Sequence, residues 1–216
     1  DLFWSDDLAL TVDNAVVNSG GAAVGGVIDI LFRRPDGTLF AANQPTRGEI
    51  PAWLRSDDGG YTWQVPAQTP GLYWVIDGAF VDDLHGVVGR DDTTRITSDG
   101  GQTWQVGGTL PATYRLIQFA LPASDRWFVA TFRSGVSGGG ILGSSDDGQS
   151  WTPVTNGIPF GSVMFWSVDF PTATTGFAGG GTSANAPRLY RTLDGGVTWQ
   201  QMAATGLTAP IRAMAW

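Results

Sequence analysis

The sequence predicts an all-β protein made of repeated four-stranded antiparallel sheets in a single domain, and three observations support this. The 216 residues include 31 Gly, 12 Pro, 10 Trp and 11 Phe, a composition typical of short strands joined by tight turns. An eight-residue turn pattern recurs along the chain, and a short apolar segment follows each copy. Helix is therefore expected to be almost absent.

The charged residues exclude several functional classes. All 12 basic residues are Arg, Glu49 is the only Glu, and the net charge is −8. A nucleic-acid partner requires a basic stripe, which this sequence nowhere concentrates, so none is expected. A membrane-spanning segment of about 18 apolar residues is also missing, so we expect no membrane insertion.

The chain has no Cys, which excludes thiolate metal sites and cysteine nucleophiles. Neither a cofactor nor a metal is predicted. Because the sequence begins at Asp1 rather than at Met, we expect a mature product or a portion of a longer protein.

The repeated turn reads Ser/Thr-x-Asp-x-Gly-x-Ser/Thr-Trp. Four complete copies are defined by the following residues: Ser56, Asp58, Gly60 and Trp63; Thr97, Asp99, Gly101 and Trp104; Ser144, Asp146, Gly148 and Trp151; Thr192, Asp194, Gly196 and Trp199. A decayed fifth copy spans residues 5–12. The Asp can accept hydrogen bonds from backbone amides two residues on, Gly allows positive φ, and Trp can pack between sheets.

This octapeptide resembles the Asp-box (BNR) repeat of β-propellers such as those of sialidases, xyloglucanases and sortilin-type proteins, in the repeat motif only. The resemblance implies that each copy is the turn between the last two strands of a blade, on the outer rim. The copies recur about every 40 to 50 residues, which suits one four-stranded blade each. Asp-box residues are therefore expected to be structural rather than ligands for calcium or sugar.

Five apolar segments are predicted to be the innermost strands of the blades: residues 27–32, 75–80, 116–121, 165–170 and 211–216. Second strands are expected near residues 38–43, 85–90, 127–132 and 176–180. The blades then span residues 27–65, 75–106, 116–154 and 165–202, and a fifth combines 211–216 with 1–12. The alternative is a segment of a longer ring of six to eight blades.

Candidate ligand-binding residues come from the innermost strands and from loops. Asp29 and Asp77 occupy matching positions in the first two innermost strands, and Gln118 and Ser167 continue the series, so we expect a solvated polar ring in the channel. Aromatic faces stack on sugars and anchor protein interfaces. The candidates for exposed aromatic residues, in loops beside prolines, are Trp53, Tyr73 and Trp74.

The leading functional hypothesis is a non-catalytic binding or scaffolding propeller that recognises a protein or a glycan. It would be a secreted, extracytoplasmic module or a domain of a larger cell-surface or virion assembly. The alternative is a fragment of an Asp-box glycoside hydrolase that uses Asp29 and Asp77 as its paired carboxylates. A third option is a resemblance to the Asp-box assembly factors of photosynthetic complexes, although the basic patch expected there is not evident.

Two other enzyme motifs are not supported by the sequence. A sialidase needs a Tyr nucleophile paired with Glu, and no Tyr can be placed beside Glu49. Residues 135–139 match the Gly-x-Ser-x-Gly pattern, but that motif acts on a strand-to-helix turn near a His and an acid. We interpret residues 134–140 as a flexible loop.

Overall fold

The computed structural model describes residues 16–18, 27–44, 53–135, 137–203 and 206–214, and within these it contains strands and turns but no helix. The first sheet contains β1 (Val16–Asn18), β2 (Val27–Arg33), β3 (Leu39–Gln44), β4 (Trp53–Ser56) and β5 (Thr62–Gln64). The second contains β6 (Asp77–Phe80), β7 (Gly86–Arg90), β8 (Thr93–Thr97) and β9 (Gln105–Val106). The third contains β10 (Tyr114–Ala123), β11 (Arg126–Arg133), β12 (Gly139–Ser144) and β13 (Thr152–Pro153). The fourth contains β14 (Met164–Asp169), β15 (Gly176–Gly181), β16 (Pro187–Thr192) and β17 (Gln200–Met202).

The predicted fold class is confirmed: consecutive strands pair antiparallel in each sheet, and an Asp-box turn joins the third strand to the fourth. The first sheet differs from the others because β1 adds to its outer edge, parallel to β5. The fifth Asp-box copy, at residues 5–12, lies outside the described residues. A ring of five blades therefore stays a prediction.

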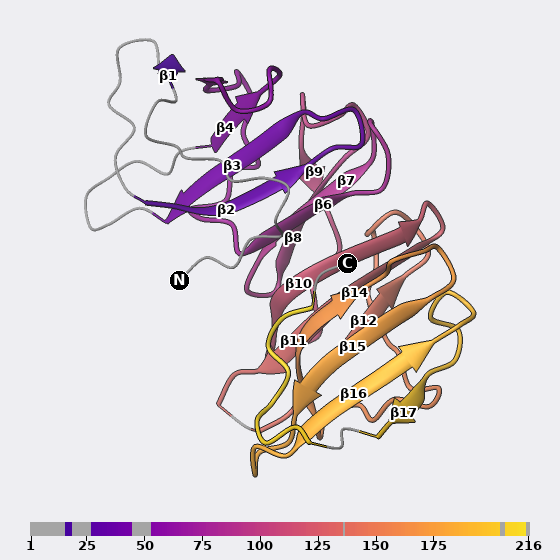
Figure 1. Cartoon of the computed structure of the whole chain (residues 1–216). Coiled ribbons are helices and arrows are strands. Elements are labelled where there is room, and N and C mark those ends of the chain that lie inside the picture. Colours follow the sequence, from indigo (N-terminus) through magenta and orange to yellow (C-terminus); the bar gives the residue numbers. More distant parts are fainter. Residues whose placement is uncertain (1–15, 19–26, 45–52, 136, 204–205, 215–216) are drawn as a thin grey trace.

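The hydrophobic cores lie between consecutive sheets. Figure 1 shows the third and fourth sheets as neighbours. Phe40 of the first sheet stacks on Phe80 of the second, and Phe128 of the third stacks on Phe170 after β14, both with ring centroids 5.2 Å apart. Trp199 of the last Asp box meets Phe128 edge-on. The motif Trp thus packs between blades, as predicted.

Residues 211–214, the described part of the predicted innermost strand at 211–216, are not in a strand with the other described residues. No second strand for this segment lies in the part of the chain that the structure describes. Its packing nevertheless repeats that of β10. A methyl group on Gly89 would lie 2.5 Å from Leu116, and one on Gly179 would lie 2.6 Å from Ile211.

Candidate functional site

The four Asp boxes share the hydrogen bonds of their first, third and seventh residues, whereas the indole N–H donates to the box Gly carbonyl only in Trp63 and Trp199. The first hydroxyl accepts a bond from the amide of the Gly four residues on, at 2.8 to 2.9 Å. The Asp carboxylate accepts the amide and the hydroxyl of the seventh residue, at 2.9 and 2.6 Å. The amide that Asp binds therefore lies four residues on, and the expectation of two residues is wrong.

These bonds hold the Asp-box carboxylates in the ionised state. The side-chain hydrogen bond from Thr62 is the main cause that lowers the pKa of Asp58 to about 2, and that from Thr198 does the same for Asp194. Burial raises the pKa of Asp99, but the bonds from Thr103 outweigh it and the net shift is downward. Each carboxylate is thus used for hydrogen bonds within its own turn.

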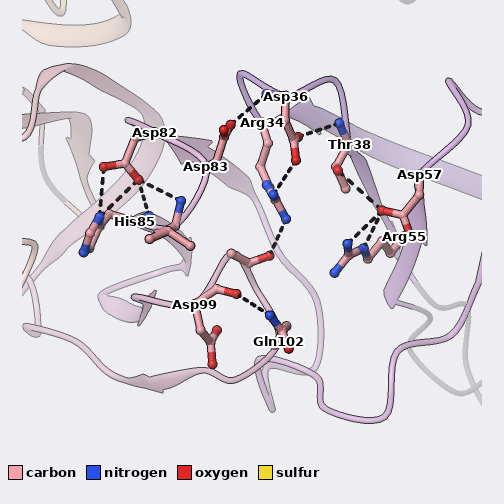
Figure 2. Close-up of polar contacts among 12 residues, drawn as sticks. Arg34, Asp36, Thr38, Arg55, Asp57, Asp82, Asp83, His85, Asp99 and Gln102 are labelled. Carbon is pink, nitrogen blue, oxygen red and sulfur yellow. Dashed lines mark hydrogen bonds and ion pairs between the residues drawn. The ribbon is translucent and has the colours of Figure 1, made fainter.

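Polar contacts also join the first two sheets at the end that carries the Asp boxes (Figure 2). Arg34, after β2, donates to the carbonyl of Gly100 in the second Asp box at 3.1 Å and pairs with Asp36. The amide of Asp36 donates to Asp83 at 2.8 Å. The His85 ring lies 2.9 Å from the carboxylate of Asp82, which also accepts a hydrogen bond from the His85 amide.

We call the end of the sheets that carries the Asp boxes the Asp-box end. The turns of hairpins β2–β3, β6–β7, β10–β11 and β14–β15 also lie at this end.

The register of the innermost strands separates the two candidate carboxylates. Asp77 pairs with Gly89, and the corresponding pairs are Ile30 with Ala42, Gln118 with Ala130 and Ser167 with Gly179. Asp29 instead falls at the bulge between Ile28 and Ile30, one residue earlier. The predicted match between Asp29 and Asp77 is therefore wrong by one residue. The side chain of Asp29 is outside the described structure.

Asp77 and Gln118 both bind the backbone of the next sheet. Asp77 Oδ2 accepts the amide of Phe119 at 2.6 Å, and Gln118 Oε1 accepts that of Val168 at 3.1 Å. Burial raises the pKa of Asp77 to about 7, against the lowering effect of the Phe119 bond. Both residues are half-buried, so the solvated ring stays a prediction.

Ser167 is the third member of this series. It is buried, with 1 % of its surface exposed, and its hydroxyl has no hydrogen-bond partner within the described residues. Asp77 and Gln118 each bond to a following sheet. Ser167 lies in the fourth sheet, and the described chain has no further sheet to which it could bond in the same way.

The three aromatic candidates differ in their solvent exposure and in their contacts. Trp53 begins β4 and is 4 % exposed in the core between the first two sheets, so its expected exposure is wrong. Tyr73 is 49 % exposed and meets Trp74 edge-on. The guanidinium of Arg90 lies 3.4 Å from the ring centroid of Trp74, so that ring is already engaged by a cation.

A pocket of about 180 Å³ lies between the third and fourth sheets, at the end opposite the Asp boxes. We call this the second-hairpin end, because hairpins β7–β8, β11–β12 and β15–β16 lie there. The polar and aromatic residues in the pocket wall are Ser137, Trp166, Thr182, Ser183, Asn185 and Arg212. The Ser137 segment was predicted to be a loop, and neither Trp166 nor Arg212 was selected. The available signal was an aromatic residue, Trp166, within a predicted innermost strand.

Arginines gather at the second-hairpin end although the net charge is negative. They are Arg90, Arg115, Arg133, Arg188 and Arg212, while the described acids of these hairpins are Asp91 and Asp92. Arg90 and Arg115 pair with these two acids at 3.1 and 3.3 Å. The other described turns carry most of the acids, including the Asp boxes. Sequence order hid this segregation because the arginines come from separate segments of the chain.

The comparisons agree with this architecture. The family model described as "BNR/Asp-box repeat" matches residues 54–65, the first complete copy of the motif. The chain is thus a β-propeller with Asp-box repeats. No curated protein matches the chain at a significant level.

Three similar solved structures are propellers of different function. The GH74 xyloglucanase from Xanthomonas campestris has a TM-score of 0.60 and 17 % identity over 82 % of this chain and 30 % of that chain. YCF48 bound to D1 peptide has a TM-score of 0.55 and 18 % identity over 82 % and 53 %. The Hadza microbial sialidase Hz136 has a TM-score of 0.52 and 16 % identity over 79 % and 43 %. This chain therefore spans about half or less of those chains, and the likeness establishes the fold alone.

Proposed function

We propose that the chain is a non-catalytic binding or scaffolding propeller that recognises a protein or glycan at its second-hairpin end. The observation that carries this proposal is the pocket where Trp166 and Arg212 meet. None of the described residues in its wall is a carboxylate. The pocket therefore offers contacts for binding but no acid or base of the kind that hydrolysis of a glycosidic bond requires.

The similar structures support a binding role without selecting the ligand. One of them is described as bound to a peptide and two as glycan-cleaving enzymes. Since propellers are rigid scaffolds whose loops carry function, the same sheets can serve either ligand class. The residues that line the pocket are therefore our basis for distinguishing a peptide ligand from a glycan ligand.

The test uses the purified chain on a glycan array and on a peptide library, with two matched variants. Trp166→Ala removes the aromatic wall, whereas Leu84→Ala removes an apolar side chain that is 52 % exposed at the Asp-box end. We expect binding that the first variant loses and the second keeps, at unchanged melting temperature. Binding that survives Trp166→Ala would contradict the proposed location.

The glycoside hydrolase alternative has one observation in its favour, the raised pKa of Asp77, which is typical of a general acid. Against it, the Asp77 carboxyl binds the Phe119 amide, and Asp29 is out of register with it. We expect no hydrolysis of xyloglucan, β-glucan or sialoside panels. Turnover that disappears in Asp77→Asn, with the fold intact, would establish the enzyme instead.

A further inference from the structure

The pocket has the size of a subsite rather than of a complete ligand site. Its volume of about 180 Å³ is below the range of about 300 to 1,000 Å³ that encloses a drug-sized ligand. One unit of a longer chain can occupy such a pocket while its neighbours run over the hairpins. The ligand is therefore expected to be a polymer.

The pocket presents a cation that no carboxylate of the described chain neutralises. Arg212 is exposed, its guanidinium lies 5.0 Å from the ring centroid of Trp166, and it makes no ion pair within the described residues. Arg90, by contrast, pairs with Asp91. An arginine held over an aromatic ring keeps its planar donors available for a carboxylate, which it binds with two parallel hydrogen bonds.

Around this cation, the wall offers groups that suit hydroxyls. The side chains of Ser137, Ser183 and Asn185 have no hydrogen-bond partner within the described part of the chain. Asn185 has φ +60° in a turn that is closed by a hydrogen bond from its backbone amide to the Thr182 carbonyl, at 2.9 Å. The apolar part of the wall comes from Met164 and Pro210, which can contact C–H groups.

We propose that this pocket binds a uronic acid unit of an acidic polysaccharide, an inference that rests on the proposed binding function. Arg212 pairs with the uronate carboxylate, and Asn185 and the serines bond the ring hydroxyls. An acidic peptide would also satisfy Arg212, but a uronate carries several hydroxyls beside its carboxylate, which suits the exposed Ser137, Ser183 and Asn185 better.

The net charge of −8 does not prevent an anionic ligand from binding at this end of the molecule. The described acids concentrate at the Asp-box end, and at an ionic strength of about 0.15 M their field is screened within about 8 Å. The charged side chain of the pocket wall itself is Arg212.

The test is titration calorimetry of the purified chain with oligogalacturonate and with the same oligomer fully methyl-esterified, which removes the charge and keeps the backbone. We expect binding of the acid form only, weakened at least tenfold by Arg212→Gln. Arg188→Gln is the matched control because Arg188 donates to the neighbouring carbonyl of Pro187 and is not part of the pocket wall. This control variant should bind within twofold of the unmodified chain.

Several outcomes would overturn the uronate assignment. They are equal binding of the ester, equal binding by Arg212→Gln, no binding of the acid form, or tighter binding of poly-glutamate of equal length. The binding function itself fails separately, when neither glycans nor peptides on the arrays respond to Trp166→Ala. If the uronate does not bind but another ligand binds in a way that depends on Trp166, the uronate assignment is wrong and the proposed binding function stands.

Discussion

Asp77 accepts a 2.6 Å hydrogen bond from the backbone amide of Phe119, so a side chain of the second sheet holds the first strand of the third. Gln118 repeats this bond to Val168 in the fourth sheet at 3.1 Å. The position that sequence analysis assigned to ligand binding thus serves to join sheets in the described chain.

The burial of Asp77 makes stability depend on pH. Burial raises the folded pKa of Asp77 to about 7, against about 3.9 in the unfolded chain. Between these values the folded state binds a proton that the unfolded state does not, so stability falls as pH rises from about 4 to 7. Relative to Asp77→Asn, which does not titrate, the unmodified chain should lose free energy of unfolding over this range. A difference that is constant in urea titrations at pH 5 and pH 8 would contradict this.

The Asp-box carboxylates should stabilise their turns. Asp99→Ala removes the acceptor for the amide and hydroxyl of Thr103 and is expected to lower the free energy of unfolding by about 1 to 2 kcal/mol. The control is Ser98→Ala, at an exposed variable position of the same turn, with an expected effect within about 0.5 kcal/mol. Loss of ligand binding by Asp99→Ala at unchanged stability would assign this turn to function instead.

Two glycines with positive φ should differ in their tolerance of a methyl group. At Gly196 a Cβ would lie 2.2 Å from the Phe128 ring, whereas at Gly37 nothing lies within 4 Å. Gly37→Ala therefore bears mainly the backbone cost, about 1 kcal/mol, and Gly196→Ala adds overpacking of about 1 to 3 kcal/mol. Thermal unfolding tests whether Gly196→Ala lowers the melting temperature more than Gly37→Ala does. The opposite order would contradict the overpacking of the Phe128 ring.

Ser167 should tolerate loss of its hydroxyl. Its Oγ is buried without a partner in the described chain, so Ser167→Ala should be neutral or stabilising. The comparison is Thr94→Val, which removes a buried bond to the Gly108 carbonyl at 2.7 Å and should cost about 1 kcal/mol or more. Clear destabilisation by Ser167→Ala would reveal a partner beyond the described residues.

We propose that residues 211–216 and 1–12 complete a fifth blade. Ile211 already packs on Gly179 as Leu116 packs on Gly89, which is the place of a following innermost strand. Hydrogen exchange should then show protected amides in residues 5–12 comparable to those of β10. Rapid exchange of residues 5–12 would favour a segment of a longer ring.

The fold could be predicted because its signals are local. An Asp box contains the groups that make its defining hydrogen bonds, as Ser56, Asp58 and Gly60 show, so eight residues are sufficient to recognise it. The candidate site could not be predicted because its members meet only in space. Trp166 lies in β14 and Arg212 in the C-terminal segment, and one bulge residue shifts Asp29 out of the series. Trp53 was misjudged because its burial depends on the neighbouring sheet.

In the Asp boxes the second and sixth positions carry none of the defining hydrogen bonds of the motif, whereas the fourth position has positive φ in all four copies. In the fourth copy Leu193 and Val197 are 61 and 58 % exposed, and Tyr61 in the first is 79 % exposed. Such positions can accept foreign side chains while the turn keeps its shape. The chain is therefore a scaffold for combinatorial display, in which randomised residues at the four turns would be presented on rigid, similarly shaped supports.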